Sequence, residues 1–134
     1  MNTSADFSAL SVEQTLYMHE HIILKAGGVR GIRDFALLHS ALERPKATFG
    51  GNDLYPTTLE KASALLHSLV MNHAFLDGNK RTAYQVMKRF LHLNHYQITA
   101  KQQEIVELCL AVDNEGWQTR QIVMWLKKHV VAVS

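Results

Sequence analysis

Side chains that could do chemistry crowd into one short segment of the chain, residues 73–81, which read HAFLDGNKR. Where Gly78 and Asn79 lead into a helix, unpaired backbone N–H groups gather at the positive end of the helix dipole, and phosphate commonly binds such an end. Lys80 and Arg81 fall in the first turn of that helix, where cations oppose the dipole unless an anion is held there. Arg81 offers a planar fork for phosphate oxygens and Lys80 a point charge. These features predict a phosphate-binding site.

The same segment carries a candidate base and a candidate metal ligand. Imidazole side chains have an unperturbed pKa of about 6.5, so a neutral His73 could take a proton from an attacking hydroxyl. Asp77 offers the hard carboxylate oxygen that Mg²⁺ takes alongside substrate phosphates and water. Base, metal ligand, phosphate cradle and two cations together describe a site for phosphate transfer.

The local chemistry also has a plainer interpretation. Residues 77–79 are strong turn formers, and the two cations after them could simply belong to a solvated helix face. The other histidines, His19 among them, are expected at the surface or at helix ends. Cys109 falls among the apolar positions of a helix and is expected to be buried rather than catalytic.

Capping residues and apolar periodicity predict helices on both sides of this segment. Thr57 and Glu60 form a capping box that opens a helix through about Asn72. After a break at residues 73–79, apolar side chains recur at helical spacing as far as Asn94. That second helix is indicated by Ala83, Val86, Met87, Phe90 and Leu91.

The rest of the chain also reads mainly as helix. Residues 46–57, beside the only two prolines, read as a long loop that could be a lid or docking segment. Residues 95–98 could be extended, but one strand cannot form a sheet. We therefore predict an all-α fold, a bundle of about six helices in one domain, 1–134. The further helices are expected from the capping box Ser11–Gln14 to Gly27, from Asp34 to before Pro45, from the capping box Thr99–Gln102 through Val112, and from Gln118 to Val130.

Composition narrows the class of protein. The chain has 134 residues, 47% of them hydrophobic and 19% charged, which suits one domain with one core. A single cysteine excludes an internal disulfide framework and fits a reducing compartment. No basic residue precedes Lys25 as in a secretory signal, and the apolar runs are too short to span a bilayer. A cytoplasmic protein is expected, and a net charge of +2 does not demand a nucleic-acid partner.

Residues 73–81 resemble the signature of the Fic/Doc family, His-Pro-Phe-x-Asp/Glu-Gly-Asn-Gly/Lys-Arg. Residues 27–34, GGVRGIRD, and 54–56, LYP, are similar to upstream segments of the death-on-curing branch, so the resemblance runs from about His19 to Asn94. It implies a small helical bundle with the motif loop between two central helices. It also implies a flap, residues 46–55, that aligns the target segment.

The resemblance implies a role for each residue of the segment. His73 would be the general base on a hydroxyl of a target protein, and Asp77 would hold Mg²⁺ on the phosphates of ATP. Gly78 and Asn79 would help form the nucleotide-binding nest together with Lys80 and Arg81. His73, Lys80 and Arg81 are accordingly the expected catalytic residues, Gly78, Asn79, Lys80 and Arg81 the expected nucleotide-binding residues, and Asp77 the expected metal ligand.

The residue type at position 80 distinguishes two reactions within the family. Lys80 stands where the adenylylating branch has glycine, and a side chain there would obstruct the usual nucleotide pose. In the death-on-curing branch the same lysine accompanies a reversed nucleotide that gives up its γ-phosphate. The resemblance thus implies a toxin kinase that acts on a translation factor, by analogy elongation factor Tu, and thereby blocks translation. The other substitution, Ala74 for proline, affects only loop stiffness.

Control of such a toxin would come from another chain. The self-inhibitory motif of many relatives, Ser/Thr-x-x-x-Glu-Gly/Asn, is missing, because Ala111 lies four residues before Glu115. A cognate antitoxin is therefore an expected partner. Two alternatives remain. One is protein adenylylation by the same loop with Lys80 swung aside. The other is a non-enzymatic helical module that binds a partner or DNA through a basic stripe, formed by Arg81 and Lys88 and extended by Arg89.

Overall fold

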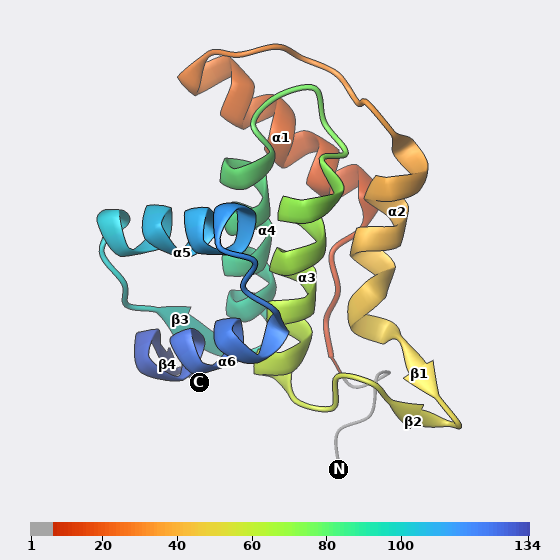
Figure 1. Cartoon of the computed structure of the whole chain (residues 1–134), viewed down its shortest axis with the longest axis vertical. Coiled ribbons are helices and arrows are strands. Elements are labelled where there is room, and N and C mark those ends of the chain that lie inside the picture. The colour runs from red at the N-terminus through yellow and green to blue at the C-terminus, as the bar shows by residue number, and fades with distance from the viewer. Residues whose placement is uncertain (1–6) are drawn as a thin grey trace.

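Helices account for most of the computed structural model, which describes residues 7–134 (Figure 1). Six α-helices lie within that range, so the prediction of an all-α bundle is confirmed. They are α1 (Val12–Ala26), α2 (Phe35–Glu43), α3 (Thr58–Asn72), α4 (Asn79–Leu93), α5 (Gln102–Asn114) and α6 (Thr119–His129).

Helices α3 and α4 lie side by side at the centre of the bundle (Figure 1). Helix α3 contacts α2, α5 and α6 as well as α4, and α4 also contacts α1. Both central helices are apolar on the faces that meet their neighbours, which is why those faces are buried. Side chains almost inaccessible to solvent come from α2 to α6, among them Leu38, Leu66, Val70, Met87, Phe90, Leu91, Leu108, Ile122 and Leu126.

Local capping interactions fix where most helices begin. The Gln14 N–H donates to Ser11 Oγ (3.1 Å), and the predicted box at Thr57 forms in the same way. Asp34 caps α2 by accepting from the Leu37 N–H at 3.0 Å. None of the helices between residues 7 and 134 is both long and apolar enough to cross a bilayer.

The predicted capping box at Thr99 is wrong, because that residue takes part in strand pairing. Strands β3 (Tyr96–Ile98) and β4 (Val130–Ala132) pair antiparallel, and the Thr99 N–H continues the ladder by donating to the His129 carbonyl at 2.7 Å. Helix α5 starts later, with the Lys101 N–H donating to Glu104 Oε1 at 2.9 Å. The extended piece thus finds its partner after α6, which ends at His129 and leaves Val130 to the strand.

The segment expected to be a long loop holds a small hairpin. A 3₁₀ turn (Arg44–Lys46) follows α2, and strands β1 (Thr48–Phe49) and β2 (Asn52–Asp53) then pair antiparallel. Gly50 and Gly51 form its turn with φ of 59° and 82°, which residues with a Cβ rarely adopt.

Candidate active site

The loop between α3 and α4 begins and ends with left-handed backbone. His73 follows the last residue of α3 with φ 47° and ψ 50°, and Gly78 precedes α4 with φ 75° and ψ 21°. Arg33 fixes the start of this loop, since Nε donates to the His73 carbonyl at 2.6 Å and Nη2 to the Asn72 carbonyl at 3.0 Å. The guanidinium thereby satisfies carbonyls that the end of α3 leaves unpaired.

The segment between α1 and α2 forms a backbone frame for the loop. The N–H groups of Arg33 and Asp34 both donate to the Ala74 carbonyl (2.7 and 3.0 Å), and the Leu76 N–H donates to the Gly31 carbonyl (3.1 Å). In Figure 1 this segment passes close to the loop that joins α3 to α4. The backbone between α1 and α2 therefore helps to hold the conformation of the loop.

Asn79 closes the loop with its side chain. Its Oδ1 accepts from the Phe75 N–H and its Nδ2 donates to the Phe75 carbonyl, both at 3.0 Å. These two bonds occupy the side-chain amide of Asn79. The group that Asn79 can offer to an anion is therefore its backbone N–H. Phe75 is buried, whereas Leu76 is exposed, because its backbone turns toward Gly31 and leaves the side chain outside the core.

His19 is a residue of this region that sequence reasoning placed wrongly. It lies on α1 and is buried, with its ring stacked on Phe75 at 3.8 Å between centroids and 7° between planes. Its Nε2 lies 2.8 Å from the Asp77 carbonyl oxygen. Thr15 and Ile23 lie four residues to either side of His19, on the buried face of α1. This spacing is the sequence signal that could have predicted the burial of His19.

Asp77 is held by two backbone N–H groups. Val29 donates to Oδ2 at 3.1 Å and Gly78 donates to Oδ1 at 2.8 Å. These bonds, the one from Val29 first, lower the pKa of the Asp77 carboxyl below its ordinary value. Asp77 is therefore ionised at neutral pH.

The donor set fits a magnesium ion that is bound partly by a substrate. Each Asp77 oxygen accepts one backbone hydrogen bond and keeps lone-pair capacity for a cation. Between residues 7 and 134 there is no group of three or more His, Cys, Asp or Glu side chains that could hold a metal alone. An ion here would depend on Asp77 together with phosphate and water oxygens, which is how Mg²⁺ is commonly bound.

Gly28 is expected to be required for the position of Asp77. A Cβ on Gly28 would lie 2.7 Å from Asp77 Oδ2, and its φ is +131°. We expect Gly28→Ala to lower the free energy of unfolding by about 2 kcal/mol, because backbone strain adds to the clash.

Gly27→Ala is the matched control for that substitution. Gly27 also has a positive φ, +81°, but nothing lies within 4 Å of an added Cβ. It should cost less than Gly28→Ala, because its backbone strain comes without a steric clash. Urea denaturation of both variants measures the difference, and equal losses would show that the contact with Asp77 does not matter.

The N-terminus of α4 leaves backbone donors available. The first N–H of this helix that pairs with the protein is that of Thr82, which donates to the Gly78 carbonyl at 3.0 Å. No side chain caps the helix, so for residues 7–134 the N–H groups of Asn79, Lys80 and Arg81 have no acceptor. Three free donors at the positive end of a helix can bind a phosphate group.

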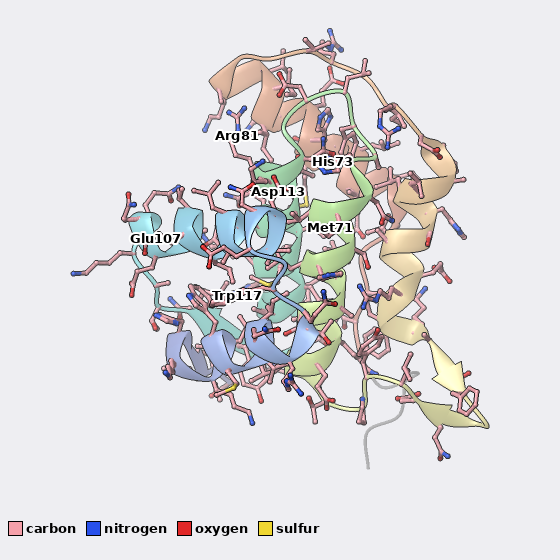
Figure 2. The ribbon with its side chains drawn as sticks, in the orientation of Figure 1. Met71, His73, Arg81, Glu107, Asp113 and Trp117 are labelled. Atoms are coloured by element: carbon pink, nitrogen blue, oxygen red, sulfur yellow. The ribbon has the colours of Figure 1, made fainter. Side chains whose placement is uncertain are left out.

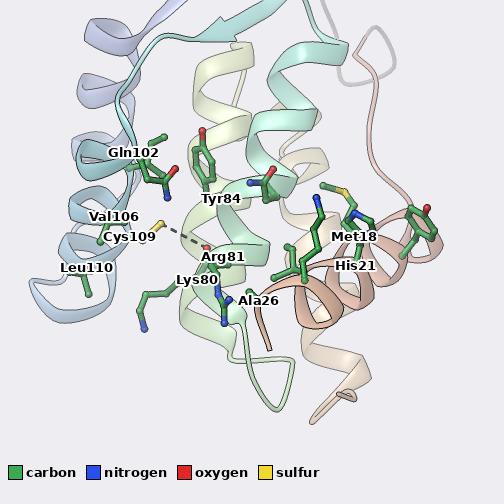
Figure 3. Close-up of a pocket in the computed structure, with 15 residues that line it drawn as sticks. Met18, His21, Ala26, Lys80, Arg81, Tyr84, Gln102, Val106, Cys109 and Leu110 are labelled. Atoms are coloured by element: carbon green, nitrogen blue, oxygen red, sulfur yellow. Dashed lines mark hydrogen bonds between the residues drawn. The ribbon is translucent and has the colours of Figure 1, made fainter. Parts of the chain in front are cut away.

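Two cations lie at this helix end in different surroundings. Lys80 pairs with Asp113 of α5 at 2.9 Å, a partner that sequence reasoning did not identify. Arg81 is exposed, and both cations border a cavity of about 580 Å³ between α1, α4 and α5 (Figure 3). Cys109 lines the same cavity and is buried, which raises the pKa of its thiol to about 11 and leaves it a poor nucleophile.

The loop and the first turn of α4 thus carry every residue that the sequence predicted for the site. His73 lies where α3 ends, Asp77 lies on the loop, and the remaining residues form the start of α4. The arrangement can bind a phosphate group at the helix end and a cation at the carboxylate. An exposed imidazole, with 49% of its side chain accessible, lies at the other end of the loop.

The match to a known protein family includes the loop and the start of α4. The family model described as "Fic/DOC family" matches residues 9–91, a span that holds α1 to α3 and most of α4. The chain is 45% identical over 91 residues to Toxin Doc of Mycolicibacterium smegmatis, an alignment that covers 64% of this chain and 70% of that relative. Members of the family are generally enzymes that transfer nucleotide or phosphate groups. By a match that includes the whole candidate site, the chain belongs to the Fic/DOC family.

Proposed function

We propose that this protein is the toxin of a toxin–antitoxin pair and an Mg-ATP-dependent protein kinase. It would transfer the γ-phosphate of ATP to a hydroxyl of a translation factor in the cytoplasm, by analogy elongation factor Tu, and so block translation. The observation that carries the proposal is the uncapped start of α4, where three free N–H groups lie beside Lys80 and Arg81. The name of the relative, Toxin Doc, supports the toxin role and, with it, a cognate antitoxin as partner.

The residues divide the chemistry between them. The N–H groups of α4 and the guanidinium of Arg81 bind the phosphates, and Asp77 would hold the magnesium ion, which when bound offsets phosphate charge. His73 takes the proton of the target hydroxyl as its oxygen forms a bond to the γ-phosphorus. The bond from that phosphorus to the bridging oxygen breaks, and ADP leaves with the electron pair.

A specific observation favours protein adenylylation as the second candidate. The ion pair with Asp113 draws the Lys80 ammonium toward α5, so its side chain need not cover the free N–H groups. A nucleotide could then approach the helix end as it does where the family has glycine. The α-phosphate would be transferred as AMP in that case, and pyrophosphate would leave.

Two labelled forms of ATP distinguish the candidates. With a translation extract as substrate, we expect label from the γ-phosphate and none from the α-phosphate to reach protein. Lys80→Gly should lower that transfer by about tenfold or more, because it removes a cation beside the transferred group. Adenylylation predicts α-label instead, preserved or raised in Lys80→Gly.

The third candidate, a non-enzymatic module, has its own outcome in this assay. It predicts that neither label moves with the wild-type protein. Binding to a partner or DNA through the basic stripe would then weaken as salt is raised. Transfer of either label would exclude it.

A further inference from the structure

Asp113 lies at the C-terminal end of α5 and faces two residues of the proposed site. Its Oδ2 accepts from Lys80 Nζ at 2.9 Å, and its Oδ1 lies 3.9 Å from His73 Nε2. Its side chain is only 20% exposed, against 41% for Lys80 and 49% for His73. Figure 2 shows Asp113 and His73 together at the end of the bundle where α3 meets the loop.

Helix α5 contacts the backbone of Lys80 as well as its side chain. The Cys109 thiol, one turn before Asp113, donates to the Lys80 carbonyl at 3.9 Å (Figure 3). Residues four apart share a helix face, so a single face of α5 meets this one residue of α4 twice. A rigid element therefore sets the direction of the Lys80 side chain.

The Asp113–Lys80 pair is expected to affect nucleotide binding and phosphate transfer in opposite directions. A carboxylate close to a phosphate site repels the phosphate and competes with it for the ammonium. The same carboxylate already restricts the flexible Lys80 side chain before the reaction. Less rotamer freedom is therefore lost when the ammonium is placed for transfer. The hydrogen bond from Lys80 is the main cause of the lowered pKa of Asp113, so the carboxyl is charged at neutral pH.

We propose that Asp113 is a positioning residue that holds the Lys80 ammonium beside His73, weakening nucleotide binding while placing the cation for transfer. This inference rests on the proposed function for its catalytic part. The family match ends at residue 91 and does not include α5, so it assigns Asp113 no role.

Lysine reactivity tests the pair without any need for catalysis. In competitive acetylation read by mass spectrometry, we expect Lys80 to react about threefold or more faster in Asp113→Asn than in the wild type. The exposed Lys88 serves as internal reference. Glu115→Gln removes the same charge from an exposed residue just after α5 and should leave Lys80 unchanged. Equal Lys80 reactivity in wild type and Asp113→Asn would overturn the inference.

Binding and transfer then test what the pair does. Asp113→Asn should bind Mg-ATP about threefold tighter in calorimetry and transfer label about tenfold more slowly. Asp113→Glu should recover part of the transfer. In a Lys80→Met background, Asp113→Asn should cause no further loss of transfer, because Asp113 acts through the lysine.

A merely structural role for Asp113 predicts a different pattern. In that case Asp113→Asn would weaken Mg-ATP binding and lower the melting temperature by more than a few degrees. Its loss of transfer would also add to the loss caused by Lys80→Met. Any of these results overturns the inference. If the wild type transfers neither label while Lys80 is protected by Asp113, the kinase proposal and the catalytic part of the inference fail. The pairing itself would then stand.

Discussion

His73→Asn is expected to reduce phosphate transfer to protein by about 10²–10⁴-fold while leaving the fold intact. The imidazole is the proposed acceptor of the hydroxyl proton, and an amide cannot take that proton at neutral pH. About half of its side chain is exposed, so the ring contributes little to stability. Transfer of γ-label from ATP measures the loss, and growth of cells that express the variant should be restored.

Asparagine is the better substitution because of the backbone at this position. His73 has φ 47° and ψ 50°, a left-handed conformation that asparagine adopts more readily than most residues. His73→Ala places a residue there that costs about 1 kcal/mol in strain, so a loss of activity would mix chemistry with loop distortion. Equal losses in both variants, with unchanged melting of His73→Asn, would attribute the effect to the missing base.

His92→Asn provides the matched control. His92 is exposed near the end of α4, away from the loop, and should tolerate the change with full transfer. If His73→Asn also kept full transfer, the proton of the hydroxyl would go elsewhere. The assignment of His73 as general base would then be withdrawn.

Helix starts were predictable where a local capping signal met no competing long-range pairing. The boxes at Ser11 and Thr57 and the cap at Asp34 act over three or four residues, and the helices that they open begin where expected. Thr99 carries an equally good local signal and yet fails, since its N–H bonds to His129 at the far end of α6. The sequence indicated that residues 95–98 could be extended, but no local signal identified residues 130–132 as their partner.

The candidate site shows the same difference between local and long-range signals. The residues proposed for chemistry are contiguous, so the short segment from His73 to Arg81 was enough to suggest them. The residues that hold them come from elsewhere: His19 reaches Asp77 across 58 positions, and Asp113 reaches Lys80 across 33. Periodicity on α1 could have indicated that His19 is buried, but only the fold brings α5 to the start of α4.

Asp77→Asn is expected to reduce transfer by about 10²–10³-fold and to remove most of its dependence on magnesium. The amide keeps the size of the carboxylate but loses the charge that would hold the ion. It also has one acceptor oxygen where the carboxylate accepts from both Val29 and Gly78, so one backbone donor loses its partner. The loop should therefore loosen as well as lose its metal ligand.

A magnesium titration of the transfer rate separates these two effects. The wild type should saturate and Asp77→Asn should respond only weakly, whereas Asp77→Glu, which keeps the charge, should retain a saturable response at higher magnesium. The pKa of Asp77 is lowered mainly by the Val29 N–H, so its carboxylate persists below the ordinary aspartate range, near pH 4. The stability that it adds is present above that range and is lost only as the pH falls through the lowered pKa. A variant Asp77→Asn that saturates with magnesium like the wild type would show that the carboxylate serves the loop alone, because its two backbone bonds would then be its whole contribution.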